Sequence, residues 1–272
     1  MGVNKQFQPG GKISERRIVW GNGRRINVFL NKNMTCLEQN IHHLHFCSKK
    51  AFKLKTLFLL LLIYYTTANA QQDTSLKNTL PAAGKMVGDK PTGKGWVNLL
   101  TSANNWNFEN NFWRLTNNTL HGDIGKEKEH HYSYTKKSYG DFELNVLIKM
   151  VGDEDANSGV CIRINPTSWD DAPGYQVDMG KGYWGSLWEE RRAGMVQKFP
   201  DSLASKIVKK NDWNHYFIIA KGHHIQAWLN GVKTIDIVHD AGFSSGAIGF
   251  QLCHLHNPTV VDIKSLYIRE IK

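Results

Sequence analysis

The stretch Asn157-Ser158-Gly159-Val160-Cys161-Ile162-Arg163-Ile164 alternates between apolar and polar or small side chains. Because successive side chains of a β-strand point to opposite faces, this spacing predicts a strand with two unlike faces. The apolar face would carry Val160, Ile162 and Ile164, and the polar face Asn157, Cys161 and Arg163. Such a strand is typical of an antiparallel sheet with one face on the core.

Two further segments repeat the pattern and add charge. Residues 174–179 place Gln176 and Asp178 on one face, and residues 185–192 end in Trp188-Glu189-Glu190-Arg191-Arg192. The aromatic residues near these segments are Trp169, Tyr183 and Trp184. Polar side chains beside aromatic rings favour a sheet face that binds a polar ligand. A solvated outer face is the alternative interpretation.

An apolar run near residue 60 predicts that the chain is exported. Four lysines between residues 49 and 55 precede the apolar residues 57–65, and Ala68-Asn69-Ala70 follows. A basic flank, a short apolar core and an A-x-A exit are typical of a secretory signal peptide. We therefore expect residues 49–70 to be cleaved after Ala70, giving a periplasmic or extracellular protein. Residues 1–48 are interpreted as sequence upstream of a misplaced start, or as an extended leader.

The formal charge of +10 belongs mostly to the part that would be removed. Residues 1–70 hold 11 of the 34 Lys and Arg and 2 of the 24 Asp and Glu, which leaves 23 basic and 22 acidic residues. A nearly neutral mature chain gives no support to a nucleic-acid partner. The apolar run is also too short for a comfortable membrane span, so no stable membrane insertion is expected.

The mature chain is expected to contain a linker or arm at residues 71–93 and an all-β domain at residues 94–272. Strands are predicted at residues 141–149, 213–220, 225–229, 232–235, 246–252 and 263–268. Asn230-Gly231 marks a two-residue hairpin, and residues 202–210 form the one short helix expected. Many short strands without βαβ alternation predict a jelly-roll sandwich of two antiparallel sheets. Cys161 and Cys253 lie in strands, and the sequence leaves a disulfide between them open.

Several segments, taken in order, resemble one protein family. Among them are Trp96-Val97-Asn98-Leu99-Leu100, Tyr139-Gly140-Asp141-Phe142-Glu143-Leu144, the stretches 157–163 and 174–178, Trp213-Asn214, Leu229-Asn230-Gly231 and Ile248-Gly249-Phe250-Gln251. Their order resembles the 3-keto-disaccharide hydrolase domain over nearly all of residues 95–272. The resemblance implies a concanavalin A-like jelly roll. It also implies a carbohydrate partner, with activity on glycosides already oxidised at C3.

A ketone at C3 acidifies the proton at C2, so the glycosidic bond at C1 can break by elimination, with hydration afterwards. This reaction needs a base near C2, a cation or donor for the enolate oxygen and an acid for the leaving group. Arg163 and Gln176 suit the enolate oxygen. Asp178, Glu189 or Glu190 could act as base or acid, or could hold a divalent metal. A plain cross-strand ion pair of Arg163 with Asp178 or Glu190 is the structural alternative.

The chain departs from the family where this chemistry needs a base. Family members commonly carry histidine where this chain has Cys253, and His254 and His256 follow at once. A bulge could turn His254 into the site; otherwise the chain would keep the sugar pocket and lose the base. The predicted catalytic residues are Arg163, Asp178, Glu190 and His254. The predicted substrate-binding residues are Asn157, Trp169, Gln176, Trp188, Glu189, Arg191 and Gln251.

Two functions are therefore in competition: an enzyme acting on 3-keto-glycosides, and a lectin-like module that binds a glycan without turnover. Neither requires a cofactor beyond the divalent metal considered above. The acidic residues 153–155 are interpreted as a solvated turn, with calcium binding as the alternative. The pairs His130-His131 and His223-His224 are interpreted as surface residues, because adjacent side chains on a strand point apart.

Overall fold

The computed structural model describes residues 14–19, 25–30, 80–127, 129–253 and 258–272. The chain divides into two units, Met1–Ser75 and Leu76–Lys272. In the first unit, β1 (Ser14–Val19) pairs antiparallel with β2 (Arg25–Leu30). The predicted signal peptide at residues 49–70 lies outside the described residues. No helix in the described ranges is long and apolar enough to cross a membrane.

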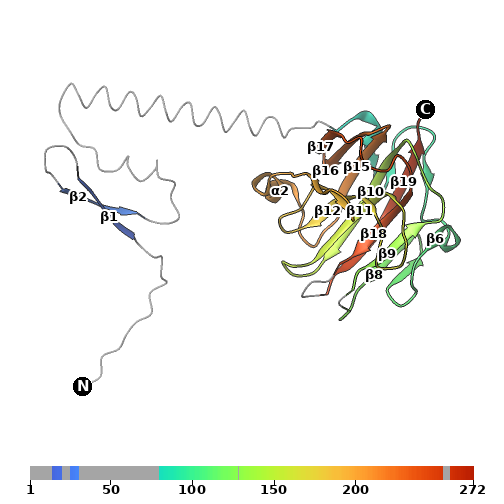
Figure 1. Ribbon diagram of the computed structural model, residues 1–272, viewed down its shortest axis with the longest axis horizontal. Helices are drawn as coiled ribbons and strands as arrows, with labels where there is room; N and C mark the ends of the chain where they lie inside the picture. Colours follow the sequence, from blue (N-terminus) through green and yellow to red (C-terminus); the bar gives the residue numbers. More distant parts are fainter. Residues whose placement is uncertain (1–13, 20–24, 31–79, 128, 254–257) are drawn as a thin grey trace, which may run out of the picture. The chain divides into compact units, whose positions relative to one another are not determined.

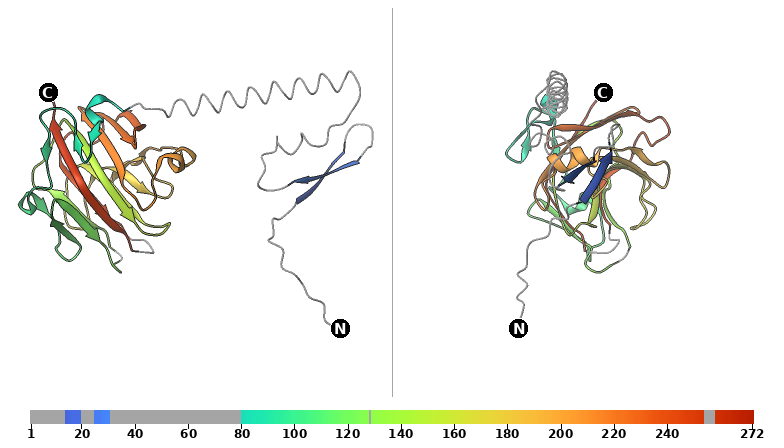
Figure 2. Two further views of the ribbon diagram at one scale, coloured as in Figure 1. Left: turned by 180° about the vertical axis from the view of Figure 1, so that it is seen from behind. Right: turned by 90° about the vertical axis from the view of Figure 1, so that its left-hand side faces the viewer.

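The second unit is a sandwich of two antiparallel sheets (Figures 1 and 2). The eight-stranded sheet contains, in spatial order, β17 (Val232–Val238), β16 (His224–Leu229), β15 (Asn214–Lys221), β10 (Phe142–Val151), β19 (Val260–Glu270), β8 (Thr119–Asp123) and β7 (Trp113–Thr116), with β5 (Val97–Asn98) also paired to β19. The seven-stranded sheet contains β14 (Gly194–Gln197), β13 (Leu187–Glu190), β12 (Gly174–Gly180), β11 (Asn157–Ile164), β18 (Ala247–Leu252), β9 (His131–Thr135) and β6 (Trp106–Asn107). The predicted all-β sandwich is confirmed.

Alternating apolar side chains from both sheets make one core. Leu144 and Val146 of β10 are completely buried. They lie in the same core as Val160 of β11 and Val177 of β12. Each such side chain contributes about 1.5–3 kcal/mol on burial, so the core dominates the stability of the sheets. The helix α2 (Asp201–Ile207) begins one residue before and ends three residues before the predicted helix, and it buries Ala204.

Residues 80–93 lie on the outer face of the eight-stranded sheet. They contain η2 (Ala82–Gly84) and the hairpin of β3 (Met86–Val87) and β4 (Lys90–Pro91). Asn145 Nδ2 donates to the Ala83 carbonyl at 3.2 Å, and Ser265 Oγ donates to the Asp89 carbonyl at 2.7 Å. These contacts explain why Asn145 and Ser265 are buried on a face that would otherwise meet solvent. This part of the expected linker therefore packs as an arm on the domain.

Arg163 does not lie on the polar face that strict alternation predicts. The pairing of β11 with β18 shifts register between Cys161 and Ile164, and Arg163 adopts a φ of 50°. This irregularity rotates the side chain, so that Ile164 packs with Cys161 in a small cluster on the outer face. A β-bulge cannot be read from spacing alone, because it depends on how the partner strand pairs.

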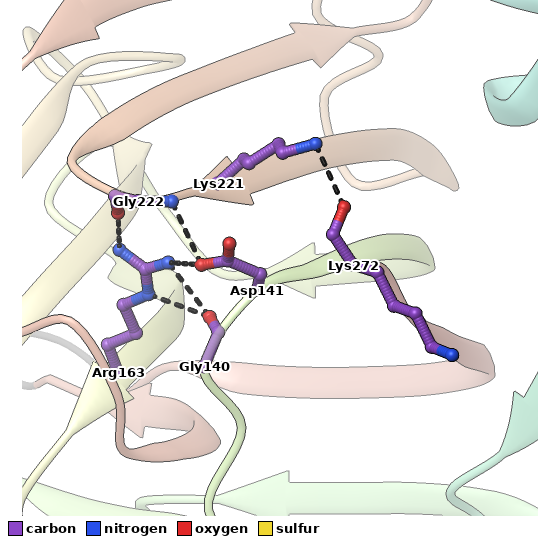
Figure 3. A network of polar contacts seen from close by, with 6 residues as sticks. All are labelled: Gly140, Asp141, Arg163, Lys221, Gly222 and Lys272. Atoms are coloured by element: carbon purple, nitrogen blue, oxygen red, sulfur yellow. Dashed lines mark hydrogen bonds and ion pairs between the residues drawn. The ribbon is translucent and has the colours of Figure 1, made fainter.

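The Arg163 guanidinium instead ties the two sheets together (Figure 3). Its Nε and Nη2 donate to the Gly140 carbonyl at 3.0 and 2.8 Å, and its Nη1 donates to the Gly222 carbonyl at 2.6 Å. Nη2 also pairs with Asp141 Oδ1 at 3.1 Å, and the same oxygen accepts from the Gly222 amide at 2.9 Å. Gly140 and Asp141 lead into β10, and Gly222 joins β15 to β16. One buried side chain of the seven-stranded sheet therefore donates hydrogen bonds to carbonyls beside the strands of the eight-stranded sheet.

We expect Arg163→Met to lower the free energy of unfolding by about 3 kcal/mol, because it removes the hydrogen bonds of a buried guanidinium to two carbonyls and leaves Asp141 without its cation. Urea denaturation would measure the loss. Arg191→Met is the matched control, since Arg191 pairs with Asp171 at an exposed position, where such pairs contribute under about 1 kcal/mol. Unchanged stability of Arg163→Met would contradict a role in joining the sheets.

Candidate active site

The outer face of the seven-stranded sheet carries the polar residues of β12. Val177 and Met179 point into the core, as predicted from the alternation. Gln176 and Asp178 therefore point outward, yet they are 2% and 4% exposed. Polar side chains that are almost fully buried on an outer face must be covered by neighbouring side chains. These two residues therefore lie at the bottom of a hollow in the face.

A cavity of about 210 Å³ opens over this face. It is lined by His130, Asn157, Gln176, Asp178, Tyr183, Trp188, Glu190, Gln251 and Cys253. These residues come from β11, β12, β13 and β18 and from the segments next to them. Six of the predicted site residues are therefore together: Asn157, Gln176, Asp178, Trp188, Glu190 and Gln251.

A chain of hydrogen bonds fixes the amides in this cavity. Gln176 Nε2 donates to Asp178 Oδ1 at 2.6 Å and to Gln251 Oε1 at 3.1 Å. Gln251 Nε2 in turn donates to the Tyr132 hydroxyl at 2.6 Å. On the other side, the Cys161 thiol donates to Gln176 Oε1 at 3.2 Å. Both amides are thus oriented by buried partners before any ligand arrives.

Gly159 on β11 provides the space for this arrangement. It lies opposite Asp178 in the register of β11 and β12. A Cβ atom at position 159 would come within 2.3 Å of Gln176 Cγ. Any larger residue there would push the glutamine out of its hydrogen bonds, so the glycine is required by close approach and not by a turn.

Burial shapes the charge of the two carboxyl groups in the cavity. Desolvation raises the pKa of Asp178 to about 7; the nearby Glu190 charge adds to the rise, while the hydrogen bond from Gln176 and the charge of Lys198 oppose it. Burial also raises the pKa of Glu190, against the opposing charge of His130. Near neutral pH the cavity can therefore hold a protonated and an ionised carboxyl together, which is what paired acid and base catalysis requires.

Two aromatic rings form one wall of the cavity. Trp188 and Tyr183 meet edge to face, with ring centroids 6.3 Å apart and an interplanar angle of 84°. Tyr183 is 42% exposed, so a ligand can reach it. Aromatic faces beside hydrogen-bonding groups suit the apolar face and the hydroxyls of a sugar ring.

Residues 91–269 match the family described as the 3-keto-α-glucoside-1,2-lyase-like domain. The chain belongs to this family. The match covers the sandwich and every described residue of the cavity. It agrees with the family resemblance seen in the sequence, and it places the chain among carbohydrate-active proteins.

Several solved structures are similar to this chain at low identity. A Parabacteroides distasonis protein, described as a candidate glycosyl hydrolase, has 22% identity and a TM-score of 0.48, covering 65% of this chain and 100% of its own. The carbohydrate-binding module CBM66 of Bacillus subtilis has 16% identity and a TM-score of 0.44, covering 65% and 96%. A Bacillus licheniformis β-glucanase has 13% identity and a TM-score of 0.45, covering 66% and 100%. The comparison with curated proteins finds no match.

Two charged residues predicted for the lyase-like site point elsewhere. Glu189 is 1% exposed and faces the other side of the sheet from Glu190, where Arg192 Nε lies 3.2 Å from its Oε1. Arg191 follows the end of β13 with a φ of 60° and pairs with Asp171 at 2.5 Å. With Arg163 committed between the sheets, none of the three predicted residues lines the cavity.

The remaining predictions concern Trp169 and His254. Trp169 lies against Tyr134, with ring centroids 5.8 Å apart, and is 38% exposed outside the cavity. His254 lies outside the described residues, so its role stays a prediction. Cys253 and Cys161 are both free buried thiols.

Sequence reasoning missed three lining residues of the cavity, His130, Tyr183 and Cys253; Tyr183 was noted only as an aromatic residue nearby. Cys253 was considered only as the position of a missing histidine, but it pairs with Asn157 through a backbone bond of 3.2 Å and faces the cavity. His130 was interpreted as a surface residue. No sequence signal could have found it, because its place depends on the pairing of β9 with β18, which a sequence pattern does not specify.

No group of three or more His, Cys, Asp or Glu side chains is placed to hold a metal ion within the described ranges. In the acidic turn, Asp153 Oδ1 accepts from the Asp155 amide at 2.9 Å, and Glu154 pairs with Lys181. These contacts are those of a solvated turn stabilised by its own side chains. In the cavity, Asp178 and Glu190 remain the oxygen ligands that a divalent ion would use.

We expect Asp178→Asn to stabilise the protein in a pH-dependent way. Because the pKa of Asp178 is raised from 3.8 to about 7, the folded state keeps a proton that the unfolded chain releases between these values. Wild-type stability should therefore fall as pH rises from about 4 to about 7, and the variant should avoid about 3 kcal/mol of that loss. Urea denaturation at several pH values, with the exposed Asp155→Asn as control, measures this gain. A gain that is the same at pH 4 and pH 8 would contradict the raised pKa.

Proposed function

We propose that this protein cleaves the glycosidic bond of sugars oxidised at C3, in the cavity over the seven-stranded sheet. The observation that carries the proposal is Asp178, a buried carboxyl whose pKa of about 7 allows both protonation states near neutral pH, next to Glu190 and Trp188. Membership of the 3-keto-α-glucoside-1,2-lyase-like family supports the substrate class.

The proposed reaction balances without an oxidant or reductant. A base removes the proton from C2, and the C–H electron pair forms the enolate with the C3 ketone. The enolate then expels the C1 oxygen, which takes a proton from an acid and leaves as an alcohol. Water adds to C1 of the resulting enone and a proton returns to C2, so that the sum of both stages is hydrolysis.

The described residues can fill most of these roles. An ionised carboxyl of the pair Asp178 and Glu190 serves as the base, and the protonated one serves as the acid for the leaving oxygen. The amides of Gln176 and Gln251, already held by their own hydrogen bonds, orient the sugar hydroxyls. Trp188 provides the stacking surface for the ring. Pre-oriented groups reduce the cost of ordering the substrate.

The test is to incubate the purified full chain with a 3-keto-disaccharide and with its unoxidised parent, with and without chelator, and to follow products by chromatography. We expect cleavage of the keto form alone, and a loss of about 100-fold or more in Asp178→Asn and Glu190→Gln. Glu154→Gln is the control, since Glu154 lies in the exposed turn and pairs with Lys181. Loss of activity with chelator would assign a divalent metal to the site.

Binding of the keto-sugar without cleavage would contradict the enzyme and support a carbohydrate-binding module instead. Equal cleavage of the parent sugar would contradict the elimination, because an unoxidised ring has no acidic C2 proton. The comparison of the keto-sugar with its parent can be made for any glycosidic linkage, so several disaccharides can be tried.

We also propose that the protein is exported, on the strength of the basic flank, apolar core and A-x-A exit at residues 49–70. After expression of the full chain in a bacterium with a secretory pathway, the protein recovered outside the cytoplasm should begin at Gln71. N-terminal sequencing checks this. A chain that keeps residues 1–70, or that stays in the cytoplasm, would contradict export.

A further inference from the structure

The described lining of the cavity holds two carboxyls and no lysine or arginine. Among its nine described lining residues, His130 has the one side chain that can become a cation. The arginines predicted nearby are committed to other partners, Arg163 to backbone carbonyls and Arg191 to Asp171. An enolate that forms here therefore needs another donor for its oxygen, and the described residues offer an imidazole.

The register of two strands brings His130 to the cavity. β9 pairs with β18 so that His131 lies opposite Leu252. The preceding residue, His130, and the following residue, Cys253, come next in this register, and both line the cavity. Burial raises the pKa of the Cys253 thiol to about 12, which leaves it neutral and a poor base or donor near neutral pH. Of these two neighbours, only the histidine can handle protons.

His131 points the other way and has partners of its own. Its Nδ1 lies 2.5 Å from Glu109 Oε2, and its ring stacks on Phe112 with centroids 3.7 Å apart. The two adjacent histidines thus occupy opposite faces, as strand geometry requires. His131 is therefore a matched control for any effect of His130.

One polar atom of His130 lacks a hydrogen-bond partner, which points to a ligand. Its Nδ1 is buried and has no hydrogen-bond partner among the described residues. A buried N–H without an acceptor is costlier than a buried lone pair, which favours the tautomer with its proton on Nε2. The ring lies near enough to Glu190 that its charge, when both ring nitrogens carry a proton, lowers the pKa of that carboxyl. The neutral ring has one N–H to donate.

We propose that His130 is a catalytic residue that donates a hydrogen bond to the C3 oxygen of the keto-sugar and stabilises the enolate. This inference rests on the proposed function. The C2–H bond breaks, its proton passes to an ionised carboxyl of the cavity, and its electron pair moves to make C2=C3. The negative charge then lies on the C3 oxygen, against the ring N–H, until the C1–O bond breaks.

The test follows enolisation and cleavage separately. A 3-keto-disaccharide is incubated in D2O with the full chain, and NMR measures exchange of the C2 proton beside release of the leaving sugar. We expect His130→Ala to slow both processes by about 100- to 1,000-fold at saturating substrate, with KM changed less than threefold, as for loss of one oxyanion donor. His131→Gln should stay within about threefold of wild type in both readouts.

A second variant distinguishes loss of the hydrogen-bond donor from a folding defect. His130→Gln keeps a side-chain N–H of similar reach and should retain about tenfold more exchange than His130→Ala, if donation to the oxygen is what matters. Cleavage by His130→Ala within threefold of wild type would overturn the role of His130 and leave the proposed function standing. A wild-type protein that neither exchanges nor cleaves would overturn both.

Discussion

The two-residue period of β11, β12 and β18 is the constraint on which the rest of this domain depends. Val160, Val177 and Phe250 are completely buried between the sheets, and each fixes which of its neighbours must face outward. A slip of one residue in any of these strands would send its apolar set to solvent, at a cost of several kcal/mol. The core therefore determines the site: Gln176, Asp178 and Gln251 share the outer face because their neighbours belong to the inner one.

The bulge at Arg163 shows how a local exception to the alternation serves the fold. A regular continuation of the register, in which Ile162 lies opposite Tyr175, would place Arg163 on the outer face opposite Gly174. The irregular pairing with β18 turns its guanidinium toward the other sheet instead. The same side chain then satisfies carbonyls from segments 23 and 59 residues away in the sequence. One irregular backbone position thus supports the packing of the two sheets, and the described wall of the cavity contains no arginine.

Sequence patterns were sufficient for whatever depends on period and composition. They located the strands β10 to β13 and β15 to β19, the short helix and six of the lining residues, because those residues lie at alternate positions of single strands. They failed where a neighbouring strand or a turn decides the outcome. Glu189 and Glu190 face opposite sides of the sheet because they are adjacent on a strand. The sequence analysis did not decide which of the two faces the cavity. Arg191 lies in the turn after β13 and Trp169 in a bend between strands, and His130 reaches the cavity through a cross-strand register that no local signal specifies.

The balance of charge in the cavity restricts what it can bind. One buried and one half-buried carboxyl with raised pKa values, amides fixed by buried partners and an aromatic wall favour a neutral ligand rich in hydroxyls. An anionic ligand such as a phosphate would meet no lysine or arginine among the described lining residues, and both carboxyls would repel it. The near-neutral pKa of Asp178 comes mainly from burial, which outweighs the hydrogen bond from Gln176 and the charge of Lys198. A carboxyl that gains or loses its proton near neutral pH, in a described wall without lysine or arginine, is suited to moving protons on an uncharged sugar.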